Sequence, residues 1–273
     1  MVKKHDLFIM ISIGISVLFL ISEQTHRKDI YTWDYNQEIN VGNEKIITVT
    51  TFNMQYGKGT DNRVNLNRTI DTLRGLDADI ISLQEVERNS VRSHFKDQVA
   101  VIAESLEMNA VFAPSLTYPG LYYGNAILSR YPVQETTILP FSNKVENRTA
   151  MLAKLQLTEE QAIYVLNTHL GLNKEERLLA IEEIHEKLST LLHPIILTAD
   201  LNSLPVHQEY KAWEGLLSKT NEGTPIQTYR NKDWQIDYIF HSKEVAVGQT
   251  TVVESEASDH FPVTAMLELK GKE

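Results

Sequence analysis

Hydrophobic and polar residues alternate with two different periods from about residue 45 onward. Segments rich in Ile, Val and Thr predict strands, whereas apolar residues three and four positions apart predict amphipathic helices. Strands are predicted at 46–52, 80–83, 125–129, 133–139, 149–157, 163–168, 195–198, 235–240, 245–252 and 263–269. Helices are predicted at 67–76, 95–108, 174–192 and near 206–217.

Strands outnumber helices in this pattern, and both hairpins and crossovers occur. The pattern predicts an α/β fold in which two packed β-sheets are flanked by helices. The chain has 273 residues, of which 42% are hydrophobic and 23% charged, which suits one large domain plus an appendage. We predict this domain over residues 45–270.

The N-terminus carries a charge-free apolar run, residues 7–21, with Lys3 and Lys4 before it and polar residues after it. Its length fits the core of a signal peptide better than a full span of about 20 residues. No Ala-x-Ala-like cleavage site follows, because the first alanine is Ala78. For residues 1–22 we therefore favour an uncleaved signal anchor over a cleaved signal peptide, with a buried core helix as the third alternative.

The two lysines also predict the orientation of the chain. By the positive-inside rule they stay in the cytoplasm, so everything after residue 21 lies outside it. We expect a single-pass protein of the cell membrane with an extracytoplasmic domain, or a secreted protein if the segment is cleaved. Residues 23–44 are predicted as a linker. The alternating Tyr31, Trp33 and Tyr35 favour an edge strand or a linker packed on the domain over a membrane-interface contact.

Charge and cysteine content exclude some classes of function. The formal net charge is −10 and the basic residues are scattered, which argues against a wide basic track for nucleic acid without excluding a nuclease. The chain has no cysteine, so disulfides, thiolate catalysis and Cys-ligated zinc are absent.

Candidate chemistry follows from six apolar runs that each end in polar groups, at 51–54, 82–86, 167–170, 198–202, 236–239 and 258–261. Carboxylate oxygens bind a hard cation such as Mg²⁺, while amides and imidazoles stabilise phosphate charge and transfer protons. Together the runs predict a site for metal-assisted phosphoester cleavage. They supply Asn53, Glu85, His169, Asp200, Asn202, Asp237, Asp259 and His260.

Taken singly, each of these residues has an ordinary structural explanation. Glu85, which follows a short apolar strand, is equally explained as a solvated loop acid. Asp200 and Asn202 share one face of an extended segment, or form an Asx-turn. Asp237 is either exposed or hydrogen-bonded to a histidine, and His169 is either a ligand of phosphate or a satisfied core histidine. Only their joint order favours a site.

In that joint order the chain resembles the endonuclease/exonuclease/phosphatase superfamily, which includes deoxyribonuclease-like and neutral-sphingomyelinase-like hydrolases. The resemblance covers about residues 46–269 and implies a four-layer α/β sandwich of two mixed β-sheets, with the site at one edge. It is carried by ThrPheAsnMet, LeuGlnGluVal, GlyAsnAlaIleLeuSerArg, AsnThrHisLeuGly, AlaAspLeuAsnSer, IleAspTyrIle and SerAspHisPhePro.

The resemblance also implies roles for the residues that match. Glu85, Asn53 and Asp259 would bind Mg²⁺, with Mn²⁺ as an alternative ion. Water activation, phosphate binding and proton transfer would fall to Asp200, Asn202, His169, and His260 paired with Asp237. Two further residues, Asn125 and Arg148, would contact the substrate phosphate.

We therefore predict a membrane-anchored, monomeric phosphodiesterase that acts on a phospholipid or another small phosphodiester. The alternatives are an extracytoplasmic nuclease and a non-catalytic surface binding module. The aromatic and aliphatic stretch 114–123 is either a loop that touches lipid or stacks on bases, or a partly buried loop beside the substrate.

Overall fold

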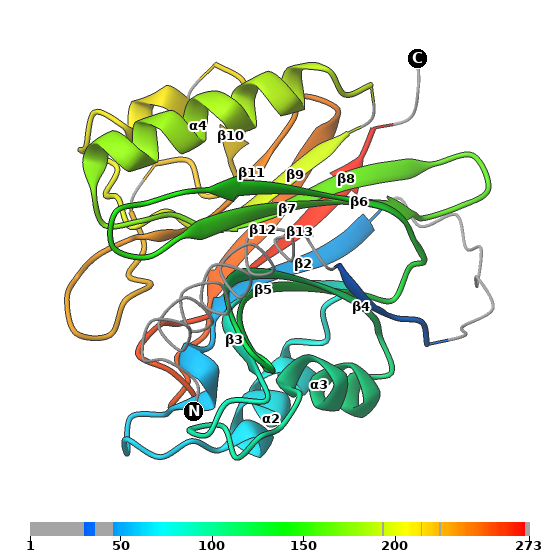
Figure 1. Ribbon diagram of the computed structural model, residues 1–273. Helices are drawn as coiled ribbons and strands as arrows, with labels where there is room; N and C mark the ends of the chain where they lie inside the picture. Colours follow the sequence, from blue (N-terminus) through cyan, green and yellow to red (C-terminus); the bar gives the residue numbers. More distant parts are fainter. Residues whose placement is uncertain (1–29, 36–45, 193, 214, 224, 271–273) are drawn as a thin grey trace, which may run out of the picture.

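The computed structural model describes residues 30–35, 46–192, 194–213, 215–223 and 225–270. Within these ranges the chain forms two mixed β-sheets that pack face to face, with helices on the two outer faces (Figure 1). This arrangement confirms the predicted pair of mixed sheets. The membrane segment predicted within residues 1–22 lies outside the described residues. No helix among the described residues is long and apolar enough to span a membrane.

The seven-stranded sheet has the order β1-β4-β5-β3-β2-β13-β12. Its only parallel pair, β2 with β3, lies near the middle of the sheet within the described residues. The strands are β1 (Tyr31–Trp33), β2 (Ile46–Asn53), β3 (Ile80–Arg88), β4 (Asn109–Tyr118), β5 (Leu121–Ser129), β12 (Val245–Val252) and β13 (Val263–Leu269).

The six-stranded sheet has the order β10-β11-β9-β8-β7-β6 and also has a parallel pair, β8 with β9. In both sheets the parallel strands are joined by a helical crossover, as expected for parallel neighbours. The strands are β6 (Val133–Phe141), β7 (Arg148–Gln156), β8 (Ala162–His169), β9 (Ile195–Asp200), β10 (Ser218–Lys219) and β11 (Asp237–His241).

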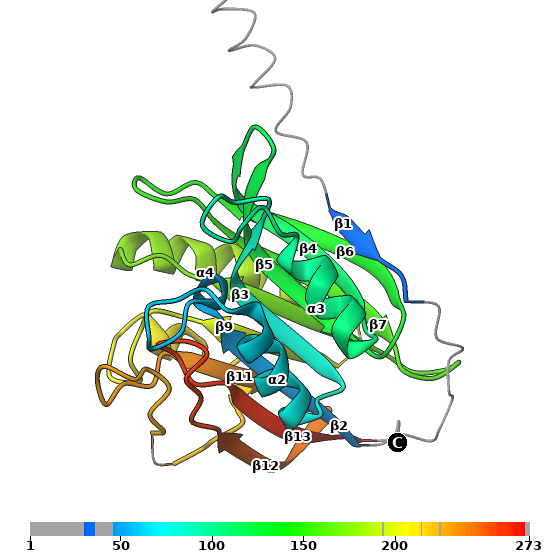
Figure 2. The same ribbon diagram turned by 90° about the horizontal axis from the view of Figure 1, so that it is seen from below.

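The helices complete four layers. α4 (Lys174–Ser189) covers the outer face of the six-stranded sheet, and α2 (Leu66–Leu76) and α3 (Gln98–Leu106) lie next to each other on the outer face of the other sheet (Figure 2). One apolar core fills the space between the sheets and two more lie under the helices. The central strands β3, β8 and β9 are therefore buried on both faces, whereas β6, β12 and β13 have exposed positions.

A buried hydrogen-bond network joins the two sheets near the ends of their parallel strands. The Gln84 amide donates to Asn167 Oδ1 over 2.7 Å, and the Asn167 amide donates to the carbonyls of Leu83 and Ala126. Thr198 Oγ1 donates to Ser82 Oγ nearby, also across the sheets. Because buried polar groups need partners of defined geometry, this network fixes how the strand ends of one sheet lie against those of the other.

β1 is an edge strand of the domain, paired antiparallel with β4. The Arg88 guanidinium, at the end of β3, lies 3.8 Å from the ring centroid of Tyr31 and 4.9 Å from that of Trp33, and it forms an ion pair with Asp97. Such cation–π contacts stabilise a desolvated guanidinium. Of the alternatives for the aromatic stretch, the structure shows the edge strand, within the segment predicted as linker.

Three predicted elements differ from the structure. The helix predicted near 206–217 is only a short 3-10 turn, Tyr210–Trp213. The helix predicted from residue 95 begins after Asp97, whose carboxylate caps it by accepting from the Ala100 N–H. The stretch predicted as a loop at 114–123 is the β4–β5 hairpin, because strand pairing continues to Tyr118 and Leu121.

Candidate active site

Three of the predicted residues form one row across the six-stranded sheet. His169 ends β8 and pairs with Asp200 at the end of β9, and Asp200 pairs with Asp237 at the start of antiparallel β11. Side chains that are opposite each other on neighbouring strands point to the same face. That face is the one toward the other sheet, because Ile196, two strand repeats from Asp200, belongs to the core between the sheets.

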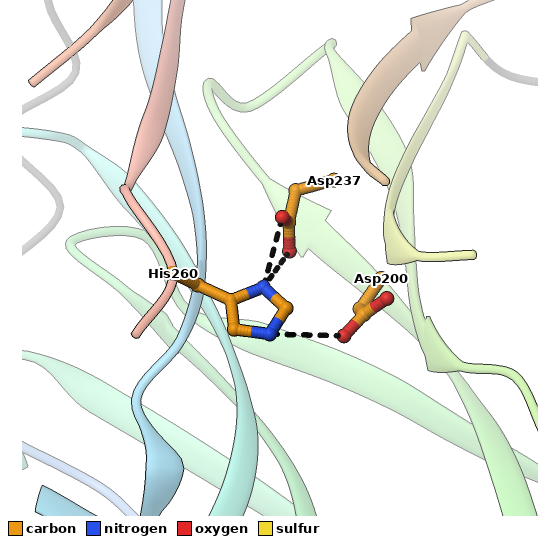
Figure 3. Close-up of side chains that lie close together, drawn as sticks. All are labelled: Asp200, Asp237 and His260. Atoms are coloured by element: carbon orange, nitrogen blue, oxygen red, sulfur yellow. Dashed lines mark hydrogen bonds and ion pairs between the residues drawn. The ribbon is translucent and has the colours of Figure 1, made fainter. Parts of the chain in front are cut away.

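His260 reaches this row from the other sheet, in the loop before β13 (Figure 3). Its Nδ1 lies 3.0 and 3.2 Å from the two carboxylate oxygens of Asp237, and its Nε2 lies 3.9 Å from Asp200 Oδ2. Asp237 is therefore not an exposed strand residue. It is fully buried and hydrogen-bonded to a histidine.

The proton of this pair resides on the imidazole. Burial alone would lower the pKa of His260, but the Asp237 carboxylate outweighs burial and raises that pKa to about 10. Burial, opposed by His260 and assisted by Asp200, raises the pKa of Asp237 to about 6, which is still well below the histidine value. At neutral pH the pair is an imidazolium held by a carboxylate.

His169 has the opposite electrostatics. Burial lowers its pKa to about 3, and the charges of Arg148 and His260 act in the same direction against Asp200. Its Nδ1 lies 3.4 Å from Arg148 Nη1, and its Nε2 lies 3.0 Å from the Asn202 amide nitrogen and 3.5 Å from Asp200. A neutral imidazole has one N–H group and one bare nitrogen, so it accepts a hydrogen bond from only one of these two donors. The two candidate histidines thus have different protonation states within one site.

Asp200 and Asn202 lie next to each other through a turn and not through an extended segment. The Asn202 N–H donates to Asp200 Oδ1, the Asx-turn hydrogen bond, and Asn202 has a left-handed φ of 49°. Burial opposes ionisation of Asp200, but the imidazoles, of which His260 carries the charge, and the Asn53 amide hold its pKa below the ordinary value. The Asx-turn is therefore present, and it is also what brings Asp200 and Asn202 together in the site.

The shorter strand predicted at 80–83 placed Glu85 beyond its end. In the structure Glu85 lies inside β3. A break in register between Leu83 and Val86 marks a β-bulge there, and Glu85 has a left-handed φ of 58°. Bulges of this kind re-aim a side chain, and strained backbone is common at functional sites. The bulge directs Glu85 to Asn53, whose amide donates over 3.0 Å both to Glu85 and to Asp200.

Asp259 joins Glu85 and Asn53 through Gln55. The Gln55 side-chain amide donates to Asp259 Oδ2 over 3.1 Å, and the Gln55 backbone N–H donates to Asn53 Oδ1. Ser258 donates to the Asn53 carbonyl, which fixes the loop that carries Asp259. These contacts place all three predicted metal ligands in one cluster beside the Asp237–His260 pair.

Asn125 is the predicted site residue least connected to the others. Its amide donates to the Thr149 carbonyl over 2.8 Å, and none of its described hydrogen bonds goes to a site residue. It links β5 to the start of β7, next to Arg148. The structure therefore gives Asn125 a supporting position, while Arg148 itself contacts His169.

Sequence reasoning missed Gln55 and Tyr229 at the site, and it named Tyr123 only as part of the stretch 114–123. Gln55 bonds Asp259, Tyr123 is hydrogen-bonded to Glu85, and the Tyr229 ring meets the edge of the His260 ring with centroids 5.1 Å apart. Tyr123 ends the stretch 114–123 and stands two residues before Asn125, and Gln55 stands two residues after Asn53, so proximity in sequence could have identified both. Tyr229 lies in a loop without a recognisable pattern.

Two groups of residues could hold a cation. Asp200, Asp237 and His260 have ligand atoms within 4.8 Å of one another. However, His260 Nδ1 is already hydrogen-bonded to the Asp237 carboxylate, so we regard this group as a proton-transfer network. The Glu85 cluster fits a divalent cation better, because burial raises the pKa of Glu85 and no Lys or Arg pairs with it among the described residues. Its carboxylate and amide oxygens are hard donors.

Two sheets that bring buried carboxylates, amides and imidazoles together at one edge define a class of phosphoester hydrolases. The model of the Endonuclease/Exonuclease/phosphatase family matches residues 50–260, so the chain belongs to this family. Members of the family are phosphoester hydrolases that generally depend on a metal ion, and this chain is one of these enzymes.

Individual proteins are similar over most of the chain. YbhP of Escherichia coli (strain K12) is 25% identical over 246 residues, which cover 81% of this chain and 96% of YbhP. An endonuclease/exonuclease/phosphatase from Bacteroides vulgatus has a TM-score of 0.71 at 20% identity over 83% of this chain and 100% of its own. The mannosyl-6-phosphatase Bt3783 of Bacteroides thetaiotaomicron has a TM-score of 0.66 at 21% identity, over 81% of this chain and 99% of its own. The two structures establish the similarity in fold.

Proposed function

We propose that the chain is an extracytoplasmic, membrane-anchored phosphodiesterase that uses Mg²⁺ and hydrolyses a phospholipid headgroup ester or another small phosphodiester. The observation that carries the catalytic part is the convergence of the Asp237–His260 pair, Asp200 and the Glu85 cluster from both sheets. This convergence, together with membership of the family, replaces the alternative of a non-catalytic binding module.

The side chains divide the work of in-line hydrolysis between them. Asp200, ionised and held by Asn53, orients the attacking water and accepts its proton as the water oxygen bonds to phosphorus and the bond from phosphorus to the leaving oxygen breaks. The His260 imidazolium faces the phosphate, stabilises the charge on its oxygens and gives its proton to the leaving oxygen, while Asp237 holds the ring. The Asn202 amide and the neutral His169 lie on the other side of Asp200, where they orient the same phosphate.

A divalent cation held by Glu85, Asn53 and Asp259 would neutralise negative charge on the phosphate and on the leaving oxygen. The donor set favours Mg²⁺ and also accepts Mn²⁺, because all of its atoms are oxygens. The residues themselves hold the cluster in shape through the Gln55 and Ser258 hydrogen bonds.

Charge supports a small diester over a nucleic acid. The net charge is −10, and three arginines, Arg68 in α2, Arg88 at the end of β3 and Arg92 shortly after it, each form an ion pair with a carboxylate. These arginines are therefore already neutralised and offer little to a nucleic-acid backbone. The location outside the cytoplasm rests on the sequence of residues 1–22 alone, and protease treatment of intact cells, which should degrade the domain, tests it.

Hydrolysis assays on the detergent-solubilised full-length protein test the activity. We expect Mg²⁺-dependent cleavage of bis-p-nitrophenyl phosphate and of a phospholipid diester, and little nicking of plasmid DNA. Nicking at a higher rate than ester cleavage would establish the nuclease instead. No cleavage of either with Mg²⁺ or Mn²⁺ by folded protein would refute the proposal.

Glu85→Gln tests the metal site. Loss of one carboxylate should raise the Mg²⁺ concentration for half-maximal activity by about 10–100-fold, as for other altered metal sites. The measurement is a Mg²⁺ titration of activity, with calorimetric titration of Mg²⁺ as an independent readout. The control is Glu135→Gln, which removes an exposed carboxylate ion-paired to Lys154 at the far end of β6. An unchanged titration for Glu85→Gln would place the metal elsewhere.

A further inference from the structure

A glutamate next to the site occupies the anion position beside Arg148. Glu146 Oε1 lies 2.6 Å from Arg148 Nη1, while Nη1 itself lies 3.4 Å from His169. The fit is incomplete: both Glu146 Oε1 and Arg148 Nε are buried atoms without a hydrogen-bond partner among the described residues. A guanidinium that keeps a buried donor free is able to bind a further anion.

The loop that carries Glu146 is held in place between β6 and β7. The Lys144 N–H donates over 2.9 Å to Glu176 in the first turn of α4, and the Asn143 N–H donates to Asn147 Oδ1. The loop that carries Glu146 is therefore held at two points, and the Glu146 side chain, with 36% of its surface exposed, contacts Arg148 from it.

Glu146 is linked to the candidate catalytic residues by a short chain of contacts. Its carboxylate contacts Arg148, whose Nη1 lies 3.4 Å from His169 Nδ1, and His169 Nε2 lies 3.5 Å from Asp200. A phosphate bound beside Arg148 and His169 therefore lies close to Glu146 as well.

We propose that Glu146 is a specificity-determining residue that makes this site prefer singly charged phosphodiesters over doubly charged phosphomonoesters. This inference rests on the proposed function. Arg148 is the cation in contact with His169, and Glu146 already cancels its charge. A diester brings one negative charge to this position, whereas a monoester above its second pKa of about 6 brings two. Because Glu146 cancels the charge of Arg148, the second charge of the monoester gains no attraction at this position, and its affinity is on the order of tenfold lower than beside an unpaired arginine.

Glu146→Gln tests the proposal while keeping the shape of the side chain. At about pH 8, where a monoester is doubly charged, the full-length variant is assayed on p-nitrophenyl phosphate and bis-p-nitrophenyl phosphate. We expect the ratio of the two kcat/KM values to shift about tenfold toward the monoester. If Glu146 only positions Arg148, both values change by the same factor and the ratio stays constant, which would overturn the proposal.

A binding measurement separates this inference from the proposed function. Calorimetric titration with inorganic phosphate and with dimethyl phosphate should show the same shift toward the more highly charged anion in Glu146→Gln. That shift in a protein that cleaves neither ester would support the role of Glu146 although the proposed function fails. Equal selectivity of wild type and variant would refute it. Glu135→Gln, a matched change at the other end of the β6–β7 hairpin, should leave both selectivities as in wild type.

Discussion

His169 and His260 lie on either side of one carboxylate and are almost equally buried, with 4% and 6% of their surface exposed. Their pKa values nevertheless move in opposite directions, to about 3 and about 10. Burial favours the neutral form of both rings, so the difference comes from their neighbours: Arg148 beside His169, and Asp237 beside His260. Neighbouring charge, more than depth in the protein, therefore decides which imidazole acts as a cation.

Replacing the charged histidine should have the largest effect. In His260→Ala we expect kcat to fall by about 10³-fold, because the phosphate loses its positively charged partner and proton donor. Steady-state assays with Mg²⁺ measure this, and circular dichroism should show a folded protein. His241→Ala, at the other end of the strand that carries Asp237, is the matched control. Near-wild-type turnover of His260→Ala would remove this residue from the mechanism.

Replacing the neutral histidine should reduce enzyme activity less. In His169→Gln we expect kcat/KM to fall by about 10–100-fold, because the amide preserves a polar group but not the ring that lies between Asn202 and Arg148. The same assay compares the two variants directly. An effect larger than that of His260→Ala would reverse the proposed roles.

The two histidines should also give opposite slopes of stability against pH. The folded-state pKa of His169 lies below the unfolded value of 6.5, so folding stability falls as pH drops from about 6.5 toward about 3. The folded-state pKa of His260 lies above 6.5, so its contribution is complete below that pH and is lost as pH rises toward about 10. At a pH of about 5 the lowered pKa of His169 reduces the free energy of unfolding by about 2 kcal/mol.

Urea unfolding at several pH values, with EDTA present, measures these slopes. His169→Gln should lose less stability than wild type on the acid side, and His260→Ala should lose less on the alkaline side. Titrations common to all three proteins cancel in the differences. If the free energy of unfolding depends on pH in the same way in all three proteins, the two histidines do not have opposite protonation states.

The sequence predicted much of the site because its residues stand at the ends of apolar strands. His169, Asp200 and Asp237 form a row since β8, β9 and β11 are neighbours, and the family resemblance implied that the three residues share one site. Local patterns also located most strands, because the central strands are buried on both faces and are therefore rich in apolar residues. Nothing local distinguished an exposed Asp237 from one that bonds a histidine; that depends on packing against the other sheet.

The features that the sequence did not predict depend on tertiary contacts or on backbone geometry. The bulge at Glu85 interrupts a strand without any Gly or Pro to mark it. The β4 strand contains Pro114, which argues against a strand, yet it pairs on both sides for part of its length because β1 covers its outer edge. The predicted helix at 206–217 had suitable apolar spacing, but the segment packs as a turn that buries Trp213.

The position of β1 has a practical consequence for shortened versions of this protein. Tyr31–Trp33 cover the backbone of Ala110, Val111 and Phe112 at the edge of a sheet. A chain cut after residue 33 would leave that edge open to pairing with another molecule, which favours aggregation, and would take two aromatic rings away from Arg88. A soluble fragment for crystallisation should therefore begin before residue 30, although every candidate catalytic residue lies further along the chain.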